Sequence, residues 1–282
     1  MKKLKDDLLI KLDEWIIDQK LAEYSDNTLK QYRANVIKFI EFIDDECDGL
    51  NKELMLAYKK HLIEIAGSTR SINTWIVTTN KFLKYIGKKE LCIKKIKIQT
   101  KTSNEQTLSL ADYKRMLRFS KKLGLMQLHY IMKILAMTGI RISELQYFTI
   151  ENLDNNYIKV FNKGKEREII VRNDLKRELK KYCRENKIKK GFIFKGEVPG
   201  KMPAQSTIWR QMKKVAGAAR VNKKKIHAHS FRHLFAQVFL NTYDDNITEL
   251  ADILGHNSLE TTRLYTRTSS EQKRKKLENI KY

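Results

Sequence analysis

The sequence has few of the features that mark membrane or secreted proteins. None of its apolar runs approaches the roughly 20 residues that a membrane-spanning helix needs. The opening MKKLKDDLLIKLDEW is too acidic and too interrupted for a signal peptide. Cys47, Cys92 and Cys183 are odd in number and far apart, so they indicate neither a disulfide framework nor a zinc site. We therefore expect a reduced, cytoplasmic protein.

Proline is scarce, and no carboxylate cluster is obvious. Pro199 and Pro203 are the only prolines, and long stretches of the chain repeat at helical period. The acidic run at residues 44–46 is better explained as the solvated end of a helix than as a metal site. With 41% hydrophobic residues the chain can bury a core, which excludes full disorder.

Basic residues are in large surplus. Lys and Arg number 57 against 33 Asp and Glu, a formal charge of +24, and such a surplus predicts a polyanionic partner. Residues 1–106 contain 20 basic and 16 acidic residues, whereas residues 107–282 contain 37 and 17. The second part should therefore meet most of the polyanion. A membrane surface is the rival to nucleic acid, but nothing in the sequence resembles an anchor.

Residues 1–86 have the pattern of a compact four-helix unit. A first helix has Leu4, Leu8, Leu12 and Trp15 at helical spacing. In the second, Ser25 or Asp26 is the N-cap, and the apolar residues that share one face are Leu29, Tyr32, Val36, Phe39, Ile40 and Ile43. Two more helices are expected at about 51–65 and 70–86, the latter opened by Ser68 and Thr69.

Residues 87–106, GKKELCIKKIKIQTKTSNEQ, contain six lysines and two glutamates. This composition favours a solvated basic linker. A basic strap along a phosphate backbone is the alternative, and a linker between two DNA-gripping domains would be both.

From residue 107 the pattern predicts helices around a short hairpin, so the fold class is mainly α with a small antiparallel β-sheet. The runs YIKVF (157–161) and REIIV (167–171) flank the turn NKGK, where Gly164 supplies a permissive conformation. Helices are expected at 110–122, 126–138, 173–186, 206–218, 230–241, 246–254, 258–267 and 269–280.

Four local patches contain residues suited to phosphate chemistry. In AMTGIRISEL, Arg141 follows a helix end and a Thr-Gly turn. A surface arginine is the ordinary explanation, but such a break also places a guanidinium near exposed amides, a good phosphate site. Glu144, three residues on, can hold that arginine. The second patch is Lys163 in FNKGK, ordinarily a solvated turn lysine, which a mobile tip could deliver to a leaving oxygen.

The third patch, HAHSFRHLFA, places His229, Arg232 and His233 on one helix face. Two histidines four residues apart suggest a metal, but acidic or cysteine partners are missing nearby, which argues against zinc. A satisfied interior histidine is the alternative for any one of them.

The fourth patch, ILGHNSLETTRLYTR, contains His256 and Tyr265. On one ideal helix these side chains would lie on opposite faces and roughly 13 Å apart along the axis. For both to touch one phosphate, His256 must precede the helix, with Ser258 as the N-cap. Alternatively, Tyr265 serves a neighbouring subunit.

In order and spacing the four patches resemble the tyrosine recombinase (phage integrase) family. The six matching positions are Arg141, Lys163, His229, Arg232, His256 and Tyr265. The resemblance covers nearly the whole chain. It implies a helical DNA-clamping domain at 1–86, the linker at 87–106, and a mostly helical catalytic domain with a small three-stranded sheet at 107–282. One departure is Ala228, where many relatives have proline.

By that resemblance, Tyr265 attacks a DNA phosphate and gives a 3′-phosphotyrosyl enzyme with a free 5′-hydroxyl. Arg141 and Arg232 would hold the non-bridging oxygens, and His229 would be the general base. Lys163 would protonate the leaving oxygen, and His256 would donate a further hydrogen bond. The covalent ester conserves bond energy, so no metal or nucleotide cofactor is expected. The implied partners are double-stranded DNA with an inverted-repeat core site and further copies of the chain in a tetramer.

The helix at 206–218 and the residues after it are expected to grip DNA, with Ile208, Met212 and Val215 facing inward. The basic residues expected to contact phosphates are Arg210, Lys213, Lys214, Lys223, Lys224 and Lys225. A simple surface helix is the alternative.

The final SSEQKRKKLENIKY should form a charged docking helix. The expected role is integration, excision or inversion of a DNA element. Its rivals are topoisomerase-like relaxation of type IB and DNA binding without cutting.

Overall fold

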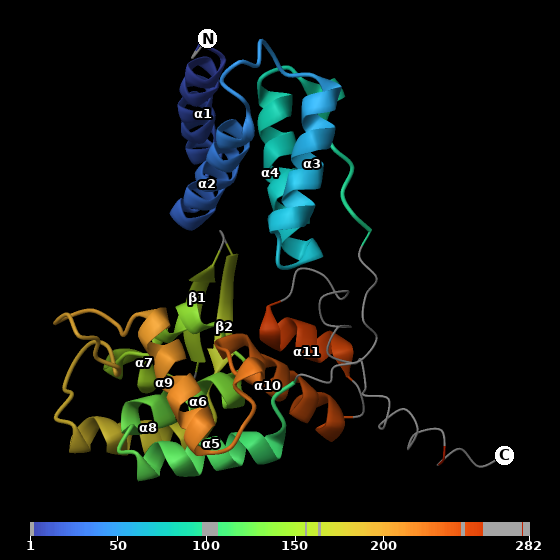
Figure 1. Ribbon diagram of the computed structural model, residues 1–282. Coiled ribbons are helices and arrows are strands. Elements are labelled where there is room, and N and C mark those ends of the chain that lie inside the picture. Colours follow the sequence, from blue (N-terminus) through green and yellow to red (C-terminus); the bar gives the residue numbers. More distant parts are fainter. Residues whose placement is uncertain are drawn as a thin grey trace. The chain divides into compact units, whose positions relative to one another are not determined.

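A computed structural model of the chain describes residues 3–97, 107–155, 157–162, 165–243, 246–255 and 278. Contacts divide the chain into two compact units, Met1–Thr100 and Lys101–Tyr282. Figure 1 colours the first unit blue to cyan and the second green to red. In the part of the chain that the structure describes, no helix is both long and apolar enough to cross a membrane.

The described residues of the first unit form four α-helices, as the periodicity predicts: α1 (Lys3–Leu21), α2 (Asp26–Phe42), α3 (Lys52–Ile65) and α4 (Thr69–Tyr85). The predicted caps are present, because the side chains of Ser25 and Ser68 each accept a hydrogen bond from a backbone N–H three residues on. Trp15, Phe39 and Phe82 are buried in the core that the four helices share. The predicted apolar faces are therefore the packed faces.

The segment after α4 stays attached to the first unit. The short 3-10 helix η1 (Lys89–Leu91) buries Leu91. The side-chain amide of Asn80 donates to the backbone oxygen of Ile93 and accepts from its nitrogen, at 2.8 and 2.9 Å. Asn73 pairs in the same way with Ile96, at 2.9 and 2.8 Å. The composition predicts a solvated linker that begins at residue 87. In the structure the chain is instead bound to α4 as far as Ile96. Residues 98–106 lie outside the described residues.

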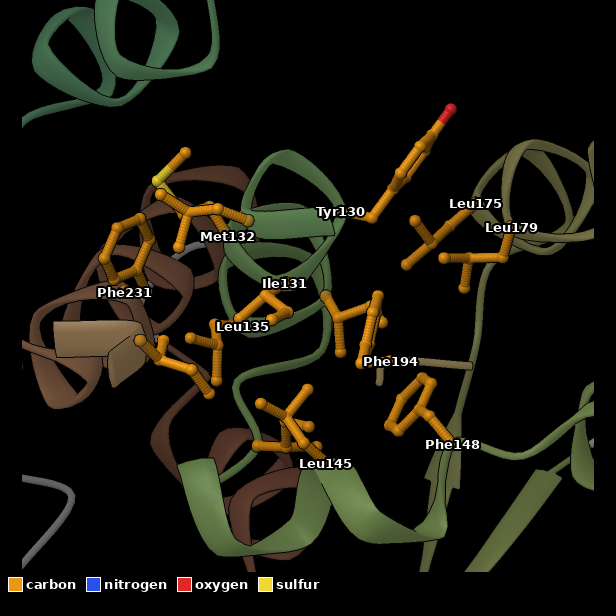
Figure 2. Packing of buried hydrophobic residues seen from close by; sticks show 14 of the residues in the cluster. Tyr130, Ile131, Met132, Leu135, Leu145, Phe148, Leu175, Leu179, Phe194 and Phe231 are labelled. Atoms are coloured by element: carbon orange, nitrogen blue, oxygen red, sulfur yellow. The ribbon is translucent and has the colours of Figure 1, made fainter. Parts of the chain in front are cut away.

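The second unit is built around α6 (Met126–Thr138), most of whose residues are buried. Figure 2 shows side chains of α6 between Phe231 on one side and Phe148 and Phe194 on the other. The other helical elements are α5 (Leu110–Lys122), η2 (Ile142–Tyr147), α7 (Ile150–Leu153), α8 (Asn173–Glu185), α9 (Gln205–Ala218), η3 (Lys223–Lys225), α10 (Ala228–Thr242) and α11 (Ile247–Leu254). The mainly α fold class is confirmed.

Strands β1 (Tyr157–Asn162) and β2 (Lys165–Ile170) form the predicted antiparallel hairpin. The register ends with Asn162 opposite Lys165, so Lys163 and Gly164 are the two connecting residues. Within the described ranges the sheet has two strands, not the three that the resemblance implies. The helices predicted at 258–267 and 269–280 lie outside those ranges. The two short elements η2 and α7 are not in the predicted set.

Candidate active site

Arg232 is a buried arginine at the junction of three helices. It lies in the first turns of α10 with only 1% of its surface exposed. Its Nη1 donates to the backbone oxygen of Gly139 at 2.7 Å, and its Nη2 to that of Leu254 at 2.8 Å. These oxygens are at the C-terminal ends of α6 and α11, where carbonyls lack intrahelical partners and the helix dipole is negative. The guanidinium therefore fastens both helix ends to α10.

Gly139 makes this junction possible. It ends α6 in the left-handed conformation, with φ of +64°, which residues other than glycine adopt at a cost. A Cβ here would lie 2.5 Å from Cδ1 of Phe235 and 2.7 Å from Cδ2 of Leu254. A glycine is thus required both for the turn and for the close approach of α10 and α11.

Arg141 follows two residues later as the N-cap of η2. Its backbone nitrogen donates to Oε2 of Glu144 at 2.8 Å, and its Nη1 to Oε1 at 3.1 Å. The contact predicted from the three-residue spacing is therefore present. The side chain of Glu144 is 2% exposed, whereas that of Arg141 is 38% exposed. The carboxylate thus holds a guanidinium that still reaches solvent.

Arg167 is a member of this cluster that the sequence patches do not include. From β2 its Nη2 donates to Oε2 of Glu144 at 2.5 Å and its Nη1 to the backbone oxygen of Ile253 at 2.7 Å. The alternation of side chains along a strand could have predicted it. Arg167 lies on the same face as Ile169 and Val171, which are both buried. An arginine on the inward face of a strand requires an internal partner.

The histidines of α10 lie beside the two predicted arginines. The rings of His229 and His233 are edge to face, with centroids 4.8 Å apart, as the four-residue spacing predicts. The pKa of His229 is lowered, first by loss of solvent around the imidazole and then by the positive charges of Arg232, His227 and Arg141. Burial lowers the pKa of His233 to about 4. His229 is therefore neutral at pH 7, which is the form that a general base needs.

Three of the six matching positions, Lys163, His256 and Tyr265, lie outside the described residues. The structure does describe the residues that directly precede Lys163 and His256. Asn162 ends β1, and Gly255 ends α11 in the left-handed conformation with φ of +63°. The predicted helix at 246–254 thus ends directly before His256. The cysteines are free thiols, and the described ranges contain no group of three or more His, Cys, Asp or Glu residues arranged to hold a metal ion.

The predicted DNA-gripping residues lie on α9 and η3. Ile208, Met212 and Val215 are buried as predicted. On the rest of this surface Arg210, Lys214, Lys223 and Lys224 are exposed, and Lys213 and Lys225 are half-buried. The ammonium of Lys213 lies 5.2 Å from the ring centre of the half-exposed Trp209 and donates to the backbone oxygen of Lys223. These contacts organise the basic residues into a surface with one exposed aromatic ring.

Comparisons with known proteins agree with the predicted resemblance. The model of the phage integrase family matches residues 106–272. The chain is 25% identical over 270 residues to tyrosine recombinase XerD of Staphylococcus aureus strain Mu50, covering 89% of this chain and 91% of that protein. XerD of Staphylococcus epidermidis is 24% identical over 273 residues, with the same coverage.

Solved structures show the same fold. A lambda integrase dimer bound to a COC′ core site superposes with a TM-score of 0.73 at 16% identity, over 90% of this chain and 93% of that one. The Tn1549 transposon integrase in complex with transposon right end DNA gives a TM-score of 0.70 at 17% identity, over 97% and 99%. Because the family match spans more than half of the chain, the chain belongs to the phage integrase family and is a tyrosine recombinase, an enzyme of site-specific DNA recombination.

Proposed function

We propose that this recombinase breaks and rejoins DNA strands through Tyr265, with Arg141, Lys163, His229, Arg232 and His256 as its other catalytic residues. The observation that supports this most directly is the convergence of three of them at the C-terminal end of α6. Arg232 binds the last carbonyl of that helix end, Arg141 follows it by two residues, and the pKa of His229 responds to both guanidiniums. Two cations and a neutral base in one place suit attack on a phosphodiester.

Each role follows from what the reaction requires. A phenol has an ordinary pKa near 10, so attack needs a proton acceptor, and neutral His229 takes that proton as the bond from Tyr265 to phosphorus forms. Arg141 and Arg232 stabilise the charge on the non-bridging oxygens. The bond from phosphorus to the 5′-oxygen breaks as Lys163 donates a proton to that oxygen, and His256 donates a hydrogen bond to the phosphate.

The reverse reaction uses the same groups. A 5′-hydroxyl attacks the phosphotyrosyl ester, its proton goes to Lys163, and His229 returns a proton to the departing phenol. One phosphoester replaces another at each step, so we expect neither a metal ion nor a nucleotide to be consumed. The free cysteines fit a reaction in the reducing cytoplasm.

The substrate that we propose is double-stranded DNA with an inverted-repeat core site, bound by four copies of the chain. The basic surface on α9 and η3 would contact the phosphates. Support for the assembly comes from a solved lambda integrase tetramer bound to a Holliday junction, which has the same fold. The likeness to a transposon integrase favours integration or excision of a mobile element. The final segment, 269–282, would dock on the next protomer.

The proposal is tested by trapping the covalent intermediate. The protein is mixed with a library of nicked duplexes in EDTA, denatured with SDS, and the DNA that stays bound is sequenced, with Tyr265→Phe in parallel. We expect adducts at one inverted-repeat site with the wild type and none with the variant. Adducts at scattered sites would favour topoisomerase-like relaxation. Tight DNA binding without adducts would favour a binding protein and would overturn the proposed chemistry.

A further inference from the structure

Arg167 joins three elements of the active site, and none of the catalytic roles above involves it. It lies in β2, four residues after Lys163 in the chain. One nitrogen of its guanidinium binds the carboxylate of Glu144, which also holds Arg141. The second terminal nitrogen, Nη1, binds the backbone oxygen of Ile253, three residues before His256. The hairpin, η2 and the end of α11 therefore meet at one side chain.

The packing around Arg167 indicates that this position is built for it. Its side chain is only 13% exposed, and Gly255 lies against it, because a Cβ on that glycine would be 2.6 Å from Cδ of Arg167. A residue with a side chain at 255 would push the arginine away from the end of α11. A glycine is therefore needed here both for the left-handed end of α11 and for the space that the Arg167 side chain occupies.

The charges of this cluster explain what a second arginine does. The carboxylate of Glu144 is buried beside Arg141, and alone the two would form a neutral ion pair. Arg167 adds a second guanidinium to the same carboxylate, so the three groups together have a net charge of +1. Arg141 is the more exposed of the two arginines, at 38% against 13%. The surplus positive charge is therefore available on the solvent side, at Arg141.

We infer that Arg167 is a positioning residue for strand cleavage. It offsets the negative charge of Glu144, so that the positive charge of Arg141 is left uncompensated for the scissile phosphate, and it fixes the end of α11 from which His256 follows. This inference rests on the proposed function, because it assigns Arg167 a part in that same reaction.

The test measures the rate of covalent adduct formation in single turnover on the DNA site that the trapping experiment identifies. The variants are Arg167→Gln, which removes the charge but keeps a hydrogen-bond donor, Arg167→Lys, which keeps the charge, and the double variant of Arg167→Gln with Glu144→Gln. Arg172→Gln is the control, because the side chain of Arg172, two residues after β2, is 67% exposed and pairs with Asp174 in the first turn of α8. Thermal unfolding confirms that each variant is folded.

We expect Arg167→Gln to slow adduct formation by about 100-fold, the low end of the effect of losing a charge-stabilising donor. DNA affinity should stay within about threefold, since the phosphate-binding surface is intact. Arg167→Lys should lose less than about tenfold. Removing the carboxylate in the double variant should restore at least about tenfold of the rate, whereas a loss of packing alone would not be rescued. Arg172→Gln should match the wild type.

Two other results are distinguishable. If wild-type adducts form but Arg167→Gln is as fast as the wild type, or Glu144→Gln gives it no rescue, the inference is overturned and the proposed function stands. If the wild type forms no adduct that depends on Tyr265, the proposed function fails and this inference fails with it.

Discussion

Gly139 shows how strongly one residue can constrain the proposed active site. It needs both a left-handed backbone and space for two neighbouring side chains. We expect Gly139→Ala to lower the free energy of unfolding by about 2–4 kcal/mol, about 1 kcal/mol from the backbone and the rest from overpacking against Phe235 and Leu254. It should also slow strand cleavage, because its carbonyl holds Arg232. Urea unfolding measures the first effect and adduct formation the second.

Gly124 provides the matched control. It has nearly the same backbone, with φ of +68°, but a Cβ there would have no atom within 4 Å. Gly124→Ala should therefore cost only about 1 kcal/mol, the backbone part, and leave cleavage unchanged. Equal losses in the two variants would show that the crowding around Gly139 relaxes without cost.

At the residue scale, local contacts could be predicted and distant ones could not. The pair of Arg141 and Glu144 is three residues apart, so helical spacing is sufficient to find it. The partners of Arg232 are backbone oxygens 93 and 22 residues away. No periodicity reports such a contact, and the sequence therefore indicates the residue but not its burial. The contacts of Arg167 are also between residues far apart in the sequence, although its position on the inward face of the strand predicts that it is partly buried.

At the scale of elements, the predictions succeeded where a cap or a glycine fixes the end of a helix. The α6 helix has the predicted bounds, 126–138, because Gly139 ends it, and α2 begins after its predicted cap Ser25. The elements η2 and α7 were missed because they are short and depend on distant contacts. Arg167 of β2 binds the carboxylate of Glu144 in η2, and a single bridge from Thr149 to Phe192 precedes α7.

The first turns of α10 should make stability depend on pH. The pKa of His233 is about 4 in the folded protein, below the ordinary 6.5 of an unfolded histidine. As pH falls below 6.5, the unfolded chain binds the proton first. The contribution of His233 is therefore complete above pH 6.5 and is lost between pH 6.5 and 4. Between pH 7 and 5 the loss is up to about 2 kcal/mol, at 1.36 kcal/mol per pH unit.

Urea unfolding at pH 7 and pH 5 measures this loss for the wild type and for His233→Gln. The variant has no titrating group at this position, so its free energy of unfolding should fall less by up to that amount. His61→Gln, in the first unit, is the control for the loss of an imidazole from another part of the chain. The same loss in all three proteins would mean that His233 binds its proton as readily in the folded state as in the unfolded state.

At the scale of the whole molecule, charge predicted the kind of partner. The 37 basic against 17 acidic residues in 107–282 predict a polyanionic partner, which agrees with membership of a family of DNA recombinases, and that this part of the chain meets most of the DNA stays a prediction. The division into units was less visible. Contacts divide the chain between Thr100 and Lys101, whereas the apolar pattern ends at residue 86. The reason is that Asn73 and Asn80 attach the following segment through side-chain amides, which a hydrophobic pattern does not record.

The basic surface on α9 and η3 can be separated from the general charge of the protein by salt dependence. We expect replacement of Lys223, Lys224 and Lys225 by Gln to weaken DNA binding and to make the plot of log affinity against log salt less steep by up to about 2.7, since each phosphate contact contributes about 0.9. The control replaces Lys187, Lys189 and Lys190, three exposed lysines after α8, and removes the same total charge. Its slope should stay near that of the wild type, because we expect these lysines to touch no phosphate. Charges farther from the DNA than a Debye length are largely screened by salt. If both triple variants lose the same slope, DNA binding reflects net charge alone, and η3 is no special part of the DNA-binding surface.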